Sequence, residues 1–133
     1  MSDTFAADLR KFAERTNKSL DDICRGVAIK WFSSTVMSTP VDTGRLRGNW
    51  LVSQGSPITA ELARFDKSGS IVQGEIVQSV GGVGTVNYLV NNLPYAERIE
   101  YDCWSNQAPS GMVRVNFARI KAIISEVAAG NAV

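Results

Sequence analysis

The stretch SLDDICRGVAIKWFSSTVMSTP, residues 19–40, carries the strongest periodic pattern in the sequence. Four of its residues recur at intervals of four, which is the spacing of one face of an α-helix, and apolar residues flank them: Ile23, Val27, Trp31 and Thr35. Asp21 and Asp22 would lie in the first turn, where the helix dipole favours negative charge. We expect the helix to end at Thr39, because the residue before a proline is pushed out of the helical region.

Shorter patterned segments flank this helix. An N-terminal arm over residues 1–18 includes a short amphipathic helix at 4–15. The sequence predicts strands at residues 49–54 and 85–91, helical turns at 94–101, a terminal helix at 112–127 and a frayed tail at 128–133.

Three segments are less regular. Residues 70–80 fit both a helix and a strand, and we favour the helix although Gly74 costs it about 1 kcal/mol. Residues 40–48 are expected as a loop and residues 55–69 as an exposed loop with little structure. The sum is one α+β domain over residues 1–133: a long N-terminal helix and a C-terminal helix packed on a small, mostly antiparallel sheet, with extended loops.

The amino-acid composition limits the classes of function that this protein can have. Apolar residues make up 44% and charged residues 20% of the 133 positions, which is ordinary for a soluble globular protein. The net charge of +1 gives no support for a nucleic-acid binder. The chain has no histidine, which excludes Ser-His-Asp and Cys-His catalytic sites and zinc sites that need imidazole. We expect no enzyme activity, no cofactor and no metal.

The cysteines and the N-terminus indicate the cellular compartment in which the protein folds. Cys24 and Cys103 are far apart and fit neither a redox motif nor zinc spacing. Met1 to Thr4 lacks the basic and apolar regions of a signal peptide, and no apolar run reaches membrane-spanning length. We expect a protein that folds in a reducing cytoplasm with free thiols and has no membrane contact.

Gly81-Gly82-Val83-Gly84-Thr85 is rich in glycine. A phosphate-binding loop would need a lysine after the last glycine, and Thr85 stands there instead. The sequence therefore predicts a turn between two elements.

The segment TPVDTGRLRGNW, residues 39–50, is the densest local signal. Pro40 and Gly44 predict a stiff turn, in which Asp42 can accept hydrogen bonds from nearby amides. Arg45 and Arg47 lie on either side of Leu46, and two guanidinium groups near such a turn suit the carboxylates of a partner or a phosphate backbone. We favour a protein partner or neighbouring subunit, because the rest of the chain is not basic.

A second dense stretch covers residues 94–112, PYAERIEYDCWSNQAPSGM. Tyr95, Tyr101 and Trp104 place amphipathic aromatic rings beside an irregular loop. Core packing is expected for Tyr95, whereas a tryptophan next to a polar Pro/Gly loop favours an interface.

Three segments together resemble the neck and tail-completion (head–tail joining) proteins of tailed bacteriophages. The matching segments are Pro40 to Trp50, Asn91 to Tyr101 and Trp104 to Arg114, in the family's order and with a variable middle. One departure is visible: the family often has glycine after the I-E-Y triplet, and this chain has Asp102-Cys103.

The resemblance implies a structural virion component at the head–tail junction, assembled in the cytoplasm of a host bacterium. Such proteins form a ring, here of six or twelve copies, between the capsid connector and the tail tube. DNA passes through the ring without sequence recognition. We expect the interface with neighbouring subunits, neck, connector and tail-tube proteins to include Asp42, Arg45, Arg47, Trp50, Tyr95, Trp104, Met112 and Arg114.

Three alternatives remain open at this stage. A tail terminator, which caps the tail tube, belongs to the same class. A nucleic-acid-binding module would use Arg45, Arg47 and Arg114 and would bind duplex DNA with a steep salt dependence. A small hydrolase would need Asp42, Glu97 and Glu100 clustered around a cavity, although we expect the two glutamates on a solvated face or paired with Arg98.

Overall fold

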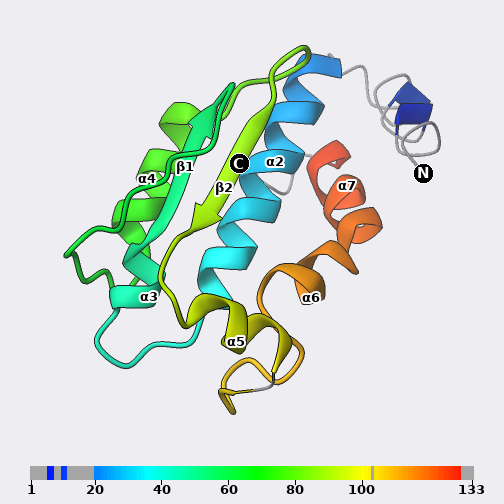
Figure 1. Ribbon diagram of the computed structural model, residues 1–133. Coiled ribbons are helices and arrows are strands. Elements are labelled where there is room, and N and C mark those ends of the chain that lie inside the picture. Colours follow the sequence, from blue (N-terminus) through cyan, green and yellow to red (C-terminus); the bar gives the residue numbers. More distant parts are fainter. Residues whose placement is uncertain (1–5, 8–9, 12–19, 103, 130–133) are drawn as a thin grey trace.

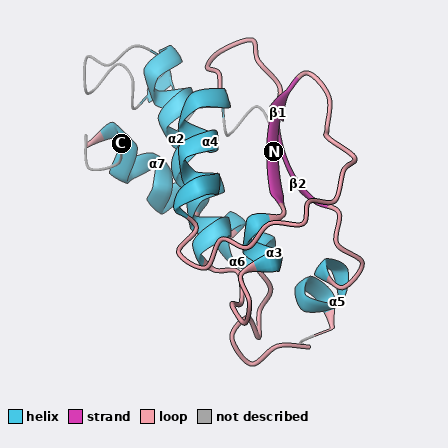
Figure 2. Cartoon of the chain, turned by 90° about the vertical axis from the view of Figure 1, so that its left-hand side faces the viewer, coloured by secondary structure: helices cyan, strands magenta, loops and turns pink. Residues whose placement is uncertain are grey.

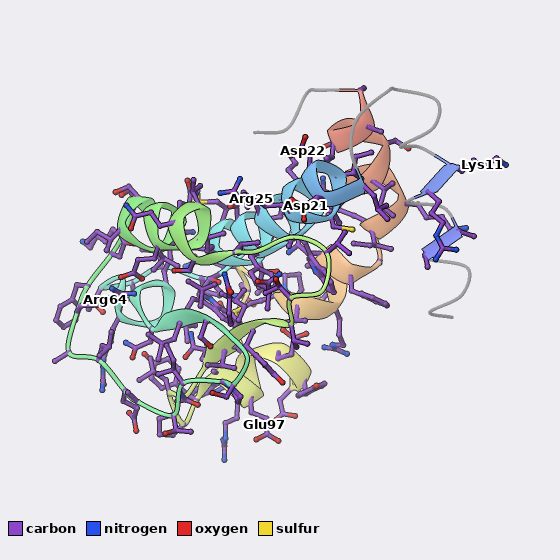
Figure 3. The ribbon with its side chains drawn as sticks, turned by 90° about the horizontal axis from the view of Figure 1, so that it is seen from above. Lys11, Asp21, Asp22, Arg25, Arg64 and Glu97 are labelled. Atoms are coloured by element: carbon purple, nitrogen blue, oxygen red, sulfur yellow. The ribbon has the colours of Figure 1, made fainter. Side chains whose placement is uncertain are left out.

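A computed structural model of the chain describes residues 6–7, 10–11, 20–102 and 104–129 (Figure 1). The predicted long helix is present as α2, Leu20–Met37. It runs through the middle of the molecule, between helix α4, Ser70–Ser79, and helix α7, Ile120–Ala128 (Figure 1). Its N-terminal end carries Asp21, Asp22 and Arg25 (Figure 3).

The sheet has two strands in the described part of the chain. Strand β1, Trp50–Gln54, pairs antiparallel with β2, Asn87–Asn91, so that Trp50 lies opposite Asn91 and Gln54 opposite Asn87. The strands form a layer beside α2 and α4 (Figure 2). This arrangement confirms the predicted α+β class with a small antiparallel sheet.

The ambiguous segment at residues 70–80 is a helix, as favoured. Val72 and Ile76 of α4 are fully buried, and Gly74 faces open space. The carboxylate of Asp66 accepts the N–H of Val72 at 3.0 Å. It thereby satisfies one of the amides that the first turn of a helix leaves without an intrahelical partner.

Two apolar clusters hold the domain together. The larger fills the space between α2, α4, the sheet and helix α5, Ala96–Tyr101. The smaller lies between the first half of α2 and α7 and consists of Ile23, Val27, Ile123, Ile124 and Val127. Helix α2 thus contributes buried side chains to both clusters.

The structure corrects two predicted elements. The terminal helix expected over residues 112–127 is split into α6, Val113–Phe117, and α7. At the break the buried Asn116 donates to Ser38 Oγ at 2.9 Å, which ties the end of α6 to the end of α2 and lets α7 turn along it. The expected loop at residues 40–48 contains a one-turn helix, α3, Arg45–Gly48.

Several expectations fall partly outside the described residues. Of the N-terminal helix at 4–15, residues 6–7 and 10–11 are described and are helical. Cys103 and residues 130–133 of the expected tail are outside the description. Within the described ranges, none of the helices combines the length and the apolar character that crossing a bilayer requires.

Candidate functional site

The three segments that carry the family resemblance meet at one end of the molecule. Residues 40–46 form one wall of a groove with a cavity volume of about 480 Å³. The other wall is supplied by Tyr95, Ile99, Trp104, Ser105 and Gln107. Leu46 and Ile99 are buried at its base. Segments separated by about fifty residues in sequence therefore build a single concave surface.

The first wall depends on Gly44. Its φ of +90° is a left-handed conformation that other residues resist. A Cβ at this position would also come within 2.7 Å of the backbone nitrogen of Lys67. Asp66 N–H donates to the Gly44 carbonyl at 3.0 Å, so the turn is fastened to the end of the 55–69 segment.

Arg47 fastens the same turn from inside. Its guanidinium donates to three backbone carbonyls: Lys67 at 2.7 Å, Thr39 at 2.9 Å and Met37 at 3.1 Å. Burial lowers the pKa of Arg47 below its ordinary value, while the nearby Asp66 carboxylate opposes that shift. Arg47 is half-buried and its guanidinium is engaged by carbonyls of its own chain, and its predicted contact with a partner stays a prediction.

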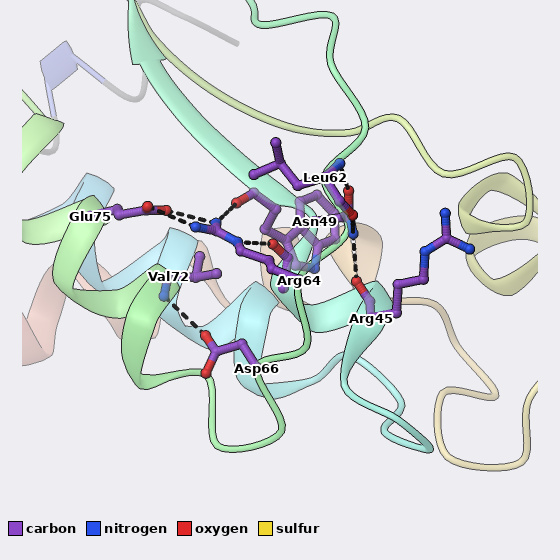
Figure 4. A network of polar contacts seen from close by, with 9 residues as sticks. Arg45, Asn49, Leu62, Arg64, Asp66, Val72 and Glu75 are labelled. Atoms are coloured by element: carbon purple, nitrogen blue, oxygen red, sulfur yellow. Dashed lines mark hydrogen bonds and ion pairs between the residues drawn. The ribbon is translucent and has the colours of Figure 1, made fainter.

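Asn49 and Arg64 hold the 55–69 segment against the body (Figure 4). Asn49 is fully buried, donates to the carbonyls of Arg45 and Leu62 at 2.8 and 2.9 Å, and accepts the Leu62 N–H at 2.7 Å. Arg64 forms a two-pronged pair with Glu75, with both N···O distances at 2.8 Å. The segment contains no helix or strand and is mostly exposed, as expected, and these side chains attach it to the rest of the domain.

The second wall is joined to the first by Gln107. Its side chain accepts the Val41 N–H at 2.9 Å and donates to the Val41 carbonyl at 3.3 Å. These paired bonds resemble a single step of a β-ladder and join the two walls of the groove. The amide side chain of Gln107 thus sets the spacing between two segments 66 residues apart.

Trp104 stands at the edge of the groove. It is 59% exposed, with the ring of Tyr95 set edge-on at 6.4 Å between centroids and the Arg98 guanidinium 5.6 Å from its ring centroid. Both contacts are favourable aromatic geometries that restrain the ring without covering it. A restrained, exposed tryptophan is suited to binding, because little side-chain entropy is left to lose.

Glu100 organises the loop behind the groove. One carboxylate oxygen accepts the N–H groups of Met112 and Val113 at 2.6 and 2.8 Å, and the other accepts Arg114 N and Nε, both at 3.0 Å. Burial alone would raise the pKa of Glu100, but these donors outweigh it and hold the pKa below its ordinary value. The sequence had led us to expect Glu100 on a solvated face or paired with Arg98. The structure corrects this, because Glu100 is buried and bonded to residues 112–114.

The charged rim of the groove consists of Asp42 and Arg45, both exposed. Arg45 approaches Glu61 at 3.8 Å, and both side chains are about half exposed. Such a pair contributes little, on the order of 0–1 kcal/mol. Arg45 is consequently the member of the Arg45/Arg47 pair that is available to a partner.

The predicted interface residues thus separate into two groups. Trp50 is 4% exposed, and its Nε1 donates to Thr39 Oγ1 at 2.7 Å. Met112 is 1% exposed. Both side chains therefore belong to the core, and their assignment to an interface is corrected. Arg114 is tied to Glu100 and lies over the Tyr101 ring. The residues that line or edge the groove are Asp42, Arg45, Tyr95 and Trp104.

Sequence reasoning missed the polar residues that build the groove. Asn49, Arg64 and Gln107 carry no catalytic or metal-binding pattern, and they bond to Leu62, Glu75 and Val41, which are 13, 11 and 66 positions away. Among the described residues, no three carboxylate or thiol groups are close enough to hold a metal ion. Comparison of the chain with protein-family models, curated protein sequences and solved structures finds no match.

Proposed function

We propose that this protein is a structural subunit of a tailed-bacteriophage particle. It forms a ring at the head–tail junction, joins the tail tube to the capsid connector and lets DNA pass. Its partners are further copies of itself and the neck, connector and tail-tube proteins around it. Assembly takes place in the cytoplasm of the host bacterium, and the ring has six or twelve copies.

The observation that supports this proposal is the convergence of the three family-like segments on one groove. One wall is formed by residues 40–46, and the other by residues between Tyr95 and Gln107, about fifty positions away in sequence. The residues between them, such as Arg47 and Glu100, serve to hold the walls in place. A surface of aromatic and charged side chains on a rigid support is what a subunit of an assembly needs.

Two other functions have weaker support. A DNA-binding module would present Arg45, Arg47 and Arg114 together, but Arg47 donates to internal carbonyls and Arg114 is paired with Glu100. A hydrolase would bring Asp42 and the two glutamates around a cavity, but Glu100 is occupied by backbone donors. A tail terminator uses the same kind of ring and remains the alternative role for this subunit.

The proposal is tested in the particle. In a phage that carries this gene, a deletion is expected to leave filled heads and tails that are not joined, and complementation with the wild-type chain should restore joined particles. Arg45→Glu should restore fewer of them, whereas Val77→Glu, a change at an exposed position of α4 that does not line the groove, should restore them fully. Normal infectious particles in the deletion strain would refute the proposal, and tails of uncontrolled length would favour the terminator role.

A further inference from the structure

Strand β2 forms one edge of the sheet. It pairs with β1, and just beyond that ladder the Gly55 N–H donates to the Val86 carbonyl at 2.9 Å. In an antiparallel ladder, residues that bond to the partner strand alternate with residues whose main-chain groups point away from it. Counting from the bond at Gly55, Tyr88 and Val90 bond to β1. The main-chain N–H and C=O groups of residues 87, 89 and 91 therefore point outward.

This outer edge of β2 has unpaired main-chain groups. Leu89 is half-buried, and its outward N–H and C=O bond to no other residue in the part of the chain that the structure describes. The edge of β1 differs, because α4 packs against that strand, Gln54 donates to the Ser79 carbonyl at 2.6 Å, and Val52 is buried. A strand edge with unpaired groups is a template for a further strand.

An apolar groove with a volume of about 460 Å³ borders the start of β2. It is lined by Asn87, the first residue of the strand, by residues 81–85, by Ala6 and Arg10, and by one side of α2. We call it the α2 groove. The residues that α2 contributes are all apolar: Leu20, Cys24, Val27, Ala28, Trp31 and Phe32.

The α2 groove matches β2 in direction and length. Asp21 accepts the Val83 N–H at 2.9 Å, so α2 and β2 both begin near the 81–85 turn, and they extend from it in the same direction (Figure 1). Residues 20–32 of α2 span about 18 Å along the helix axis. The five residues of β2 span about 17 Å. A strand added to β2 would therefore find an apolar floor along its length.

We propose that the outer edge of β2 binds an extended segment of another polypeptide as a third strand of the sheet. The main-chain groups of β2 supply the hydrogen bonds, and the α2 groove takes the side chains on one face of the added strand. The Leu89 side chain packs against the core on the α2 side of the sheet. Side chains of the added strand that point the same way alternate along it, so the segment should be apolar at every second position.

The occupant is an extended segment that has no helix of its own on that face. A second copy of the folded chain is a poor occupant, because its β2 carries an α2 helix on the same side of the sheet (Figure 2). Joined edge to edge, the two helices would compete for the same space. The α2 groove shares no lining residue with the groove of the candidate site, and this inference does not depend on the proposed function.

Amide hydrogen exchange, followed by NMR, tests whether the edge is open. In the chain alone, the Leu89 N–H should exchange at least about tenfold faster than the N–H groups of Tyr88 and Val90, which bond to β1. Slow exchange of Leu89 would overturn the inference. If the protection grows with protein concentration, a second copy covers the edge, and if it does not, the chain covers its own edge.

The binding probe is a short peptide with blocked ends that alternates lysine and valine. At saturation it should slow the exchange of the Leu89 N–H about tenfold and leave Tyr88 and Val90 unchanged. Two N-methylated forms are the matched controls, one methylated on the valine amides and one on the lysine amides. Only one set of amides can face β2, so one form should lose binding and the other should keep it. A peptide without effect on Leu89, or two methylated forms that behave alike, would contradict main-chain pairing.

One pair of variants tests the α2 groove. Cys24→Glu places a charge on the floor of the groove and should weaken peptide binding at least about tenfold. Ile71→Glu, at an exposed position of α4 that does not line the α2 groove, should bind like the wild type. Equal binding by the two variants would overturn the role of the groove. If Cys24→Glu does not fold, the two methylated peptides on the wild-type chain decide the question.

Discussion

Glu100 offers the sharpest test of how the groove is supported. Glu100→Gln keeps the shape of the side chain and removes its charge. The wild-type carboxylate accepts four N–H groups, two on each oxygen. An amide has one acceptor oxygen, so in the variant two of these donors would face an NH₂ group instead.

The expected loss follows from these bonds. A hydrogen bond to a charged group contributes about 1.5–3 kcal/mol. Two are lost, but the Arg114 side chain is half exposed and can turn to water, which reduces the penalty. We therefore expect Glu100→Gln to lower the free energy of unfolding by about 3 kcal/mol at pH 7.

The pH dependence gives the reasoning a distinctive signature. Because the pKa of Glu100 is lower in the folded chain than its ordinary value, its stabilisation is present above that ordinary value and is lost as the pH falls through the lowered pKa. The stability difference between wild type and variant should therefore shrink toward zero in acid.

Urea unfolding at a series of pH values measures this difference. Glu97→Gln, an exposed change on the same helix, is the control and should stay within about 0.5 kcal/mol of the wild type. A Glu100→Gln protein as stable as the wild type at pH 7, or a difference that does not depend on pH, would refute the account of Glu100.

Three further substitutions test the supports of the groove, each by chemical denaturation. Arg47→Met should destabilise the fold by about 2 kcal/mol because it removes three hydrogen bonds to carbonyls, whereas Arg45→Met should be near neutral; equal effects would contradict the separation of the two arginines. Gly111→Ala should cost about 2 kcal/mol or more, because the φ is +87° and the new Cβ would lie 2.8 Å from the Glu100 carbonyl oxygen; a neutral result would mean that this turn can relax. Trp50→Phe should lower the free energy of unfolding by about 1–3 kcal/mol through the loss of its buried hydrogen bond. An unchanged denaturation midpoint would mean that this bond does not stabilise the fold.

Local patterns predicted most of the secondary structure. The helix at α2 and the strands at β1 and β2 follow from periodicities that are visible without a structure. Helix α4 was correctly favoured because Val72 and Ile76 share one helical face, and Gly74 between them meets no neighbour. The split between α6 and α7 was not predictable, because the bonding partner of Asn116 is Ser38, which lies 78 residues away in sequence.

The candidate site was predicted in part. The two dense segments at residues 39–50 and 94–112 do form the groove, and Trp104 is exposed at its edge. The assignment of Trp50 and Met112 to an interface was wrong, because both side chains are buried in the core and residue type alone does not reveal which apolar side chains the fold buries. The assignment of Arg47 stays a prediction.

The sequence by itself determined the class of this protein: the periodicity of α2, the alternating strands and the absence of histidine are properties of residue order and composition. Only the tertiary structure decided which charged side chains bond within the fold and which are exposed to a partner. Arg45 and Arg47 are two positions apart, yet one points to the groove and the other to three carbonyls, because a turn of α3 sends them to different surroundings. Hydrogen bonds between segments that are distant in sequence depend on how the chain folds, so local sequence patterns do not predict them.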